Sequence, residues 1–536
     1  MLEFGVLIVL LAFAFYKWAT KHHDYFEKRN IKYLKPTILL GSTGGSFFNK
    51  YSASEFAQLI YQAFPDASIY GLFDFRVPQY VVRDPETIKQ ITVKGFDHFE
   101  DHKTFTDEKT DRLFGNALFF LKGEKWRQMR ATLSPAFTGS KMRQMFELIA
   151  ECTDGVVEHF LKKVKCGEKI NLEMKDFFTR YANDVIASCA FGLKVNSFTE
   201  PQNEFYTNGK YLLNFTGLKQ LLKMLAMFQM PTVARIFGIS LTGGPIGKSF
   251  YDTILNTMKY RKEKNIFRPD MINIMMQVRD GTLKHQTEEK KKEQEGFATV
   301  EESDVGKLLV NRTWNDDEVV AQCFLFLVAG FDTTSTLLTF AAYELAANQD
   351  VQQKLYEEIV IMNEQLDGKC INYDALQKMT FLDQVISETL RKWPPVTQVD
   401  RVCNKDYVLN VDGKSLKLEK GTPLLFPLYG IHHDAKYFPN PEKFDPERFD
   451  DANKHNIAPF TFNPFGFGPR ACIGSRFALM EIKAILYKIL LNFSIEPNEK
   501  TVIPVKLIKS AFSLQAENGM HVQFKPRTVN NFSSSI

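Results

Sequence analysis

The sequence predicts a mainly α-helical protein with a smaller β-rich part that draws on both ends of the chain. Apolar residues follow helical spacing over most of residues 126–276, and the long apolar stretch 319–347 predicts one further helix. Alternating apolar residues, which are typical of strands, occur instead at 68–84, 406–428 and 510–526. A chain of 536 residues can bury a large core around the long helix.

The N-terminus predicts a membrane anchor. Residues 4–16 are apolar without interruption, and Lys17, Trp18 and Lys21 follow directly. A bilayer needs about 17 to 20 apolar residues, so this stretch is near the lower limit. Because no small-residue cleavage site follows it, we expect an uncleaved signal anchor over residues 1–21, with a cleaved signal peptide as the alternative. The basic residues after the apolar stretch predict that the rest of the chain lies in the cytosol.

Two segments follow the anchor. Residues 22–50 carry Pro, Gly and Ser in their second half and predict a linker, and residues 51–536 predict one folded domain. Within that domain, alternation on both sides of Pro78 predicts a pair of strands, and Pro85 is expected in the first turn of the next helix. Residues 281–303 are charged and punctuated by glycine, which predicts a mobile loop.

Charge and cysteine content exclude several classes of protein. The 67 basic and 63 acidic residues leave a net charge of +4, without a basic stripe interleaved with aromatics, so we expect no nucleic-acid partner. The seven cysteines are odd in number and widely spaced, and no two form a Cys-x-x-Cys pair. This pattern argues against a disulfide framework and against a structural zinc site. We therefore expect the folded domain to lie in a reducing compartment.

Two motifs are similar to known ligand sites but lack a required feature. The Gly-Lys-Ser stretch at 247–249 resembles the end of a phosphate-binding loop, yet that loop needs glycine where Thr242 stands. We expect a turn between helices there. His432 and His433 are adjacent, and neighbouring residues rarely point at one metal ion, so a core or surface role is expected for them.

The long helix predicted at 319–347 has a polar centre. Asn315 followed by Glu318 is a capping-box pattern that marks the start of the helix. The apolar stretch would be about 43 Å long at 1.5 Å per residue, which is enough to cross a bilayer. Asp332 lies near its midpoint, however, and would cost about 3 kcal/mol in a membrane. A buried helix through a large domain is the better interpretation.

The motif Ala-Gly-Phe-Asp-Thr-Thr at 329–334 offers a reason for the polar centre. Ala329 and Gly330 have little bulk, so a ligand could approach the backbone, and Gly330 can loosen the helical hydrogen bonds. Asp332 and Thr333 supply an acid and an alcohol, which are the parts of a proton relay. The alternative is a merely flexible buried helix whose threonine hydroxyls are satisfied.

A lone cysteine, Cys472, stands between a glycine-containing loop and the start of a helix. Backbone N–H groups and the helix dipole stabilise a thiolate at such a place, which could act as a nucleophile or bind iron. A nucleophile needs a partner histidine, and none of the ten histidines is an obvious one. A thiolate-ligated haem needs close backbone approach, which Gly466, Gly468 and Gly474 allow, and cations for its propionates, such as Arg470.

The stretch 464–474 resembles the haem-binding loop of the cytochromes P-450. It reads Pro-Phe-Gly-Phe-Gly-Pro-Arg-Ala-Cys-Ile-Gly and matches every defining position, namely Phe465, Gly468, Arg470, Cys472 and Gly474. Further motifs follow in the order of the family. The Ala-Gly-Phe-Asp-Thr-Thr motif resembles its central oxygen-activating helix, with Ala329 next to the haem. Glu388, Arg391 and Arg448 match its buried ion-pair network, and Trp126, Arg130 and Arg401 match residues that contact the haem propionates.

This resemblance covers nearly the whole chain after the linker. It implies a cytochrome P-450 fold, in which a long central helix lies over haem b, and it makes residues 51–536 the catalytic domain. Cys472 would be the axial ligand of the iron, and Asp332 and Thr333 would deliver protons while O2 is activated. The pair Glu388 and Arg391 would be structural. The linker departs from the family, which often has a proline-rich run there, whereas this chain has mainly one proline.

The implied function is that of a monooxygenase anchored in the endoplasmic reticulum membrane, with its catalytic domain on the cytosolic side. The chain has no flavin or nicotinamide fingerprint, so electrons would come from NADPH through NADPH–cytochrome P-450 reductase, with cytochrome b5 as a further partner. Lys122, Lys125 and Arg127 would belong to an electropositive docking face, or else to a solvated helix face. A haem-thiolate isomerase or dehydratase, and a protein that only sequesters lipophiles, are the alternatives; the acid–alcohol pair favours monooxygenation.

The resemblance also implies a lipophilic substrate. The expected pocket residues are mostly aromatic or aliphatic: Phe105, Leu113, Phe114, Phe119, Phe326, Val396, Val399, Phe512 and Leu514. The sequences around residues 22–36 and 126–146 look most like the insect family-nine branch, which is associated with xenobiotics such as plant toxins and insecticides. Oxidation of an endogenous lipid or hormone is the alternative.

Overall fold

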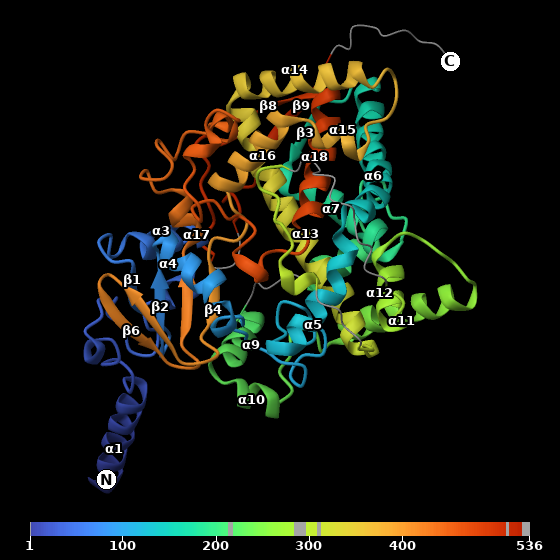
Figure 1. The fold of residues 1–536 in the computed structure, drawn as a ribbon. Coiled ribbons are helices and arrows are strands. Elements are labelled where there is room, and N and C mark those ends of the chain that lie inside the picture. Colours follow the sequence, from blue (N-terminus) through green and yellow to red (C-terminus); the bar gives the residue numbers. More distant parts are fainter. Residues whose placement is uncertain (1, 213–217, 284–295, 308–311, 511–513, 528–536) are drawn as a thin grey trace.

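The computed structural model describes residues 2–212, 218–283, 296–307, 312–510 and 514–527. They fold into a mainly helical body with smaller, separate sheets, which confirms the predicted fold class (Figure 1).

The helices are α1 (Leu2–Ala19), α2 (Gly44–Phe47), α3 (Ala53–Gln62), α4 (Pro85–Lys89), α5 (Gly123–Leu133), α6 (Gly139–Lys165), α7 (Met174–Phe191), α8 (Glu204–Leu212), α9 (Leu218–Gln229), α10 (Pro231–Ile236), α11 (Pro245–Glu263), α12 (Met271–Arg279), α13 (Asp316–Ala347), α14 (Gln349–Gln365), α15 (Tyr373–Gln377), α16 (Thr380–Lys392), α17 (Leu428–His432) and α18 (Ser475–Asn492). The strands are β1 (Ile69–Asp74), β2 (Val77–Val82), β3 (Ile170–Glu173), β4 (Val399–Val402), β5 (Tyr407–Val411), β6 (Lys414–Leu418), β7 (Pro423–Phe426), β8 (Phe493–Pro497) and β9 (His521–Pro526).

The sheets join distant parts of the chain, as the sequence predicts. In the largest sheet the order is β1-β2-β7-β4: β1 and β2 form the expected antiparallel pair, β7 runs parallel to β2, and β4 runs antiparallel to β7. A second sheet, β3-β9-β8, places a strand from near the C-terminus beside the segment that enters α7. Strands β5 and β6 form a separate hairpin. The two larger sheets therefore join segments that are far apart in the chain.

Helix α13 runs through the middle of the body (Figure 1). It starts at Asp316, where the predicted capping box is present: the Glu318 amide donates to Asn315 Oδ1 at 2.9 Å, and the Asn315 amide donates to Glu318 Oε2 at 3.1 Å. The helix is long and apolar enough to cross a membrane, but 61% of its apolar stretch is buried inside the protein. The prediction of a buried core helix is confirmed.

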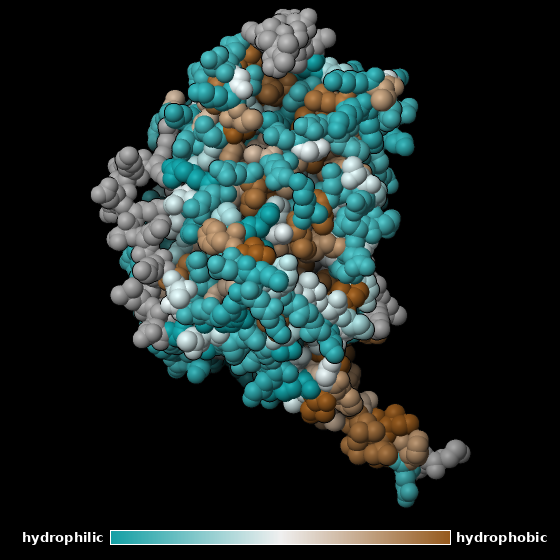
Figure 2. Space-filling view, turned by 90° about the vertical axis from the view of Figure 1, so that its right-hand side faces the viewer, coloured by the Kyte–Doolittle hydropathy of each residue, from teal (hydrophilic) through white to brown (hydrophobic). Residues whose placement is uncertain are grey.

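Helix α1 stands out from the body, and Figure 2 shows it as a brown stalk below a mostly teal surface. Its apolar side chains are exposed, from Phe4 to Trp18. The end of the helix is nevertheless attached, because the Arg76 guanidinium lies 3.5 Å from the centroid of the Trp18 ring and donates to the Trp18 carbonyl at 2.8 Å. In the segment predicted as a linker, Phe26 is fully buried against Gly71, where a Cβ would come within 2.5 Å of its ring.

The two motifs set aside in the sequence serve structural roles. Thr242 is in the turn between α10 and α11, which confirms the predicted turn for this part of the motif, whereas residues 247–249 lie at the start of α11 and are helical. His432 and His433 are both buried, and burial lowers the pKa of both rings. The described residues contain no group of three His, Cys, Asp or Glu side chains that could hold a metal ion.

A fully buried ion pair joins α16 to the segment that leads to the cysteine loop. Arg391 donates to both carboxylate oxygens of Glu388, at 2.7 and 2.8 Å, and to the carbonyl of His432 at 3.0 Å. Glu388 also accepts a bond from the Asp445 amide at 2.9 Å, and its Oε1 lies 3.4 Å from Arg448 Nε. Two residues that share one helical face thus hold two later segments of the chain.

Replacing Arg391 by Met should lower the free energy of unfolding by about 3 to 5 kcal/mol, because Glu388 would remain as a buried charge without its partner. Chemical denaturation followed by far-UV circular dichroism would measure the change. The double variant Glu388→Leu with Arg391→Met, which removes both charges, should recover part of the loss. A Lys369→Met control at an exposed position should leave stability unchanged, and an Arg391→Met protein as stable as the wild type would contradict this account.

Candidate active site

The cysteine loop is shaped by two glycines with left-handed backbone. Gly466 and Gly468 have φ values of 85° and 61°, and a Cβ on Gly468 would lie 2.2 Å from the carbonyl oxygen of Thr92. The Cys472 amide donates to the Phe465 carbonyl at 2.8 Å, which closes the loop just before α18. The left-handed backbone favours glycine at both positions, and at Gly468 only glycine also lets the loop pack this closely, so these two positions set where Cys472 stands.

Cys472 is exposed although its neighbours in the loop are half-buried or buried. Burial of the surrounding site raises the pKa of the Cys472 thiol, while a hydrogen bond from the Gly474 amide and the charge of Arg130 act in the opposite direction. A ligated metal would add a much stronger stabilisation of the thiolate. The sulfur is therefore accessible to a ligand and has two fixed groups that favour its anionic form.

The central helix is open at one place along its buried length. Ala329 and Thr333 are exposed, while Phe331, Thr334 and most residues after them are buried. Ala329 and Thr333 are one turn apart and share a face, and the Thr333 hydroxyl donates to the Ala329 carbonyl at 2.6 Å. This hydroxyl is placed at the edge of an opening in the core.

Gly330 does not serve the opening. A Cβ at this position would lie 2.5 Å from Cδ1 of Ile186, so the glycine allows α7 to approach α13 closely. The prediction that both Ala329 and Gly330 make room for a ligand is therefore wrong for Gly330. The two residues are neighbours on a helix and point about 100° apart, which separates their roles.

Asp332 has a partner that the sequence did not suggest. Lys175 Nζ lies 2.8 Å from Asp332 Oδ1, and it also donates to the hydroxyls of Ser335 and Thr336 at 2.8 and 2.7 Å. The Asp332 side chain is about half exposed and the lysine is largely buried, and burial lowers the pKa of Lys175. Asp332 thus bonds toward α7, whereas Thr333 bonds along its own helix.

Buried cations gather around the cysteine loop. Arg401 is fully buried and donates to the carbonyls of Asp400 and Phe467 at 2.6 and 2.8 Å, but its Nε has no partner and no carboxylate pairs with it among the described residues. Arg470 is nearly buried, lies 4.0 Å from the centroid of the Trp126 ring, and has one carboxylate within ion-pair distance. An uncompensated buried guanidinium calls for an anionic ligand.

Arg130 is held by a glutamate that the sequence analysis missed. Its guanidinium bonds to Glu302 at 2.8 to 3.2 Å and donates to the carbonyl of Ala471 at 2.8 Å. Glu302 belongs to the segment 281–303 that was predicted as a mobile loop; residues 284–295 lie outside the described residues, but the part around Glu302 packs against α5. No local pattern in the sequence pointed to this pairing.

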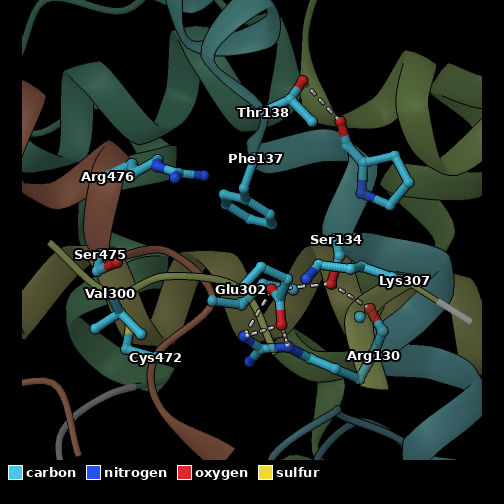
Figure 3. A pocket seen from close by; sticks show the side chains of 13 residues that line it. Arg130, Ser134, Phe137, Thr138, Val300, Glu302, Lys307, Cys472, Ser475 and Arg476 are labelled. Carbon is cyan, nitrogen blue, oxygen red and sulfur yellow. Dashed lines mark hydrogen bonds and ion pairs between the residues drawn. The ribbon is translucent and has the colours of Figure 1, made fainter. Parts of the chain in front are cut away.

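A pocket of about 500 Å³ lies beside the cysteine (Figure 3). Arg130, Glu302 and Cys472 line it together with Phe137, which points into its centre. The ring of Phe137 is 5.7 Å from that of Phe326 on α13. The cysteine loop and the central helix are therefore bridged by one aromatic side chain.

The residues expected to line a substrate pocket fall into several classes. Leu113, Phe114 and Leu514 are buried, Phe105, Phe326 and Val399 are half-buried, and Phe119 and Val396 are exposed. Phe512 lies outside the described residues. Phe105 and Phe114 belong to one cluster of rings, in which Phe114 meets Phe324 of α13 at 5.0 Å and Phe105 meets Phe228 of α9 at 4.7 Å.

His102 is a further buried polar residue at this site that the sequence analysis missed. Its Nδ1 lies 3.1 Å from Asp400 Oδ1 and 3.4 Å from Arg401 Nη1, and its ring stacks on Phe119 with centroids 4.4 Å apart. Burial lowers the pKa of His102 to about 4 despite the nearby Asp400. The ring is thus neutral at physiological pH.

His102 should make the stability of the protein depend on pH. An unfolded histidine has a pKa of 6.5, so between this value and about 4 the unfolded state binds more protons and the folded state loses stability as the pH falls. From about pH 7.5 to pH 5 this loss should be about 2 kcal/mol. Urea denaturation at both pH values should show a smaller loss for His102→Gln, and the exposed control His455→Gln should behave like the wild type. Equal losses in all three proteins would contradict the assignment.

These features fit a haem bound through cysteine. The accessible sulfur of Cys472 suits the iron. The opened face of the buried helix and the loop that allows close approach suit the ring, and the unpaired Nε of buried Arg401 suits a propionate. Arg130 and Arg470 are further cations at the same loop.

Comparison with known proteins agrees with this geometry. The family model described as cytochrome P-450 matches residues 45–522. The chain is 43% identical to "Probable cytochrome P-450 9f2" of Drosophila melanogaster over 98% of this chain and 99% of that protein. It is also 43% identical to "Cytochrome P-450 9e2" of Blattella germanica, over 97% of both, and 35% identical to "Cytochrome P-450 6j1" of the same species, over 97% of this chain and 99% of that protein. The chain therefore belongs to the cytochrome P-450 family, the haem-thiolate monooxygenases that use haem b and O2.

Proposed function

We propose that the chain is a membrane-anchored monooxygenase that oxidises lipophilic xenobiotics such as plant toxins and insecticides. The observation that carries the proposal is the placement of accessible Cys472 in a glycine-shaped loop next to a core helix opened at Ala329 and Thr333. The family-nine names of its insect relatives support the substrate class. NADPH–cytochrome P-450 reductase is the proposed electron donor, with cytochrome b5 as a second partner.

The proposed haem contacts divide by chemistry. Cys472 is the thiolate ligand, and when bound through it the haem supplies the oxygen chemistry that splits O2. Arg130, Arg401, Arg470 and Trp126 would hold the propionates, and Phe465, Gly468, Gly474 and Ala329 would contact the ring. Arg401 is the strongest candidate among the cations because it is buried without an ion-pair partner among the described residues.

Asp332 and Thr333 would deliver protons to the reaction. The Thr333 hydroxyl stands at the opening and can pass on a proton, while its bond to the Ala329 carbonyl fixes its position. Lys175 holds the Asp332 carboxylate at 2.8 Å, so Asp332 needs to exchange this partner for water before it can relay a proton inward. The acid would supply protons from the α7 side and the alcohol would place them.

The exposed apolar surface supports membrane association. Helix α1 carries exposed apolar side chains from Phe4 to Trp18, and at the end of α10 Ile236 and Phe237 are 73% and 75% exposed. A surface hollow of about 820 Å³ next to Phe237 is lined in part by Leu222 and Lys223, an apolar and a basic residue that suit a lipid interface. We propose that these elements face the endoplasmic reticulum membrane and that the body lies in the cytosol.

The proposed docking face for the electron donor needs revision. Lys125 lies 3.2 Å from Glu318, and Arg127 lies 2.7 Å from both Asp97 and Glu100, so both cations are already paired. Lys122 is exposed. Paired surface cations contribute less to steering an acidic partner, so Lys122 remains the most available member of this set.

The reduced, carbon-monoxide-bound absorption spectrum tests the haem assignment. The wild type should show a strongly red-shifted Soret band, and Cys472→Ser should lose it, since the serine oxygen cannot supply the thiolate ligand. Cys370→Ser, at an exposed cysteine on the loop after α14, should keep the band. A wild-type band at the position usual for imidazole-ligated haem would contradict ligation by Cys472. If the wild type shows the red-shifted band, the next measurement is the turnover of a panel of lipophilic compounds with reductase and NADPH.

Removing the Thr333 hydroxyl should separate electron consumption from product formation. In Thr333→Ala the yield of product per NADPH should fall by about tenfold or more, because protons would no longer be placed at the opening. Thr333→Ser, which keeps a hydroxyl, should restore most of the yield. Product and NADPH measured in the same reaction would show this, and an unchanged ratio in Thr333→Ala would exclude the proposed role.

A further inference from the structure

The carboxylate of Asp111 accepts hydrogen bonds from two segments that are far apart in the chain. Asp111 is 1% exposed. Its Oδ1 accepts from the amides of Leu113 and Phe114, at 3.2 and 3.1 Å, in the loop before α5. Its Oδ2 accepts from the Leu241 and Thr242 amides at 3.0 and 3.1 Å, in the turn between α10 and α11. One side chain thus fixes the backbone of both segments.

Two hydroxyls complete this arrangement. Ser240 Oγ donates to Oδ2 at 2.7 Å, and Thr242 Oγ1 donates to Oδ1. The carboxylate therefore has six donors, but no Lys or Arg pairs with it among the described residues. Hydrogen bonds to an ionised group are stronger than neutral ones, and backbone amides can stabilise a buried anion without a cation.

The loop that Asp111 fixes carries the aromatic cluster over the central helix. Phe114, whose amide bonds to Asp111, packs edge-on against Phe324 of α13 and Phe120 of its own loop. Phe105, earlier in the loop, meets Phe228 of α9. If the loop and the turn separate, these rings lose their fixed backbone.

The other ion pairs of this loop are at the surface. Asp107 pairs with Arg235 of α10, and Arg112 pairs with Asp317 of α13 at 2.5 Å, but all four side chains are 40% exposed or more. Exposed ion pairs contribute little to stability. The buried carboxylate is therefore the main polar link between the loop and the turn.

We propose that Asp111 is a positioning residue that latches the loop 105–121 to the turn 240–242 and thereby holds the rings of Phe105, Phe114 and Phe120 in place against α9 and α13. Its effect on substrate entry rests on the proposed function, with Phe105 and Phe114 as the expected lining of the substrate pocket. The latch itself depends only on the hydrogen bonds described here. Residues of this kind set which shapes of lipophile a pocket admits, because they fix the backbone that carries the lining side chains.

Hydrogen exchange of the full-length protein tests the latch directly, because four of its six donors are amides. In Asp111→Asn and Asp111→Ala the amides at 113–114 and at 241–242 should both exchange about tenfold faster. Glu108→Gln, which removes an exposed charge from the same loop, should leave both protected. Unchanged exchange, or faster exchange in only one segment of the Asp111 variants, would overturn the proposal.

A variant on the opposite segment guards against misfolding of the Asp111 proteins. Thr242→Val removes one hydrogen-bond donor and keeps the side-chain shape. It should speed amide exchange at 113–114, where no atom has been changed. Exchange at 113–114 as slow as in the wild type would overturn the latch. Stopped-flow uptake of Nile red by the Asp111 variants then tests the pocket. Faster uptake of Nile red supports the proposal that the latch holds the rings of the loop over the substrate pocket. Faster amide exchange with unchanged Nile red uptake supports the latch and overturns the pocket assignment.

Discussion

The rest of the site depends on the buried ion pair of Glu388 and Arg391. Burying two charges is tolerated only when each is fully hydrogen-bonded, and here the additional bonds go to segments that approach the cysteine loop. Arg391 binds the His432 carbonyl, and His432 in turn accepts a bond from the Asn463 amide at 3.3 Å, where the loop begins. The position of Cys472 is therefore fixed through a chain of polar contacts that starts on α16.

A second constraint is the concentration of positive charge near the loop. Arg130, Arg401 and Arg470 are all at least nine-tenths buried, and only the first has a closely bonded carboxylate. Burial of guanidinium groups lowers the pKa of Arg401 and Arg470, yet both stay charged at neutral pH. The folded state of a protein that buries such groups is stabilised most by a ligand with two carboxylates. Binding of that ligand and folding then support each other.

Short motifs predicted much of the fold and part of the site. The central helix and its cap, the strand pair at Pro78 and the cysteine loop each follow from residues close in sequence, so local patterns were sufficient. Partners far apart in sequence were out of reach: Lys175 lies 157 residues before Asp332, and Glu302 lies 172 residues after Arg130. Gly330 shows a different limit, since only the packed structure shows whether a missing side chain makes room for a ligand or for a helix.

The clamp of Arg76 on Trp18 has a consequence for encounters between proteins. It ties the end of α1 to the turn between β1 and β2, so the stalk and the body are joined through a side-chain contact as well as through the backbone. With α1 in a bilayer, the body would keep a narrow range of tilts over the lipid surface. The body would then meet a membrane-bound electron donor by diffusion in the plane of the membrane, with the contact faces of the two proteins already aligned. A larger fraction of collisions would be productive, without any gain in the affinity of the contact.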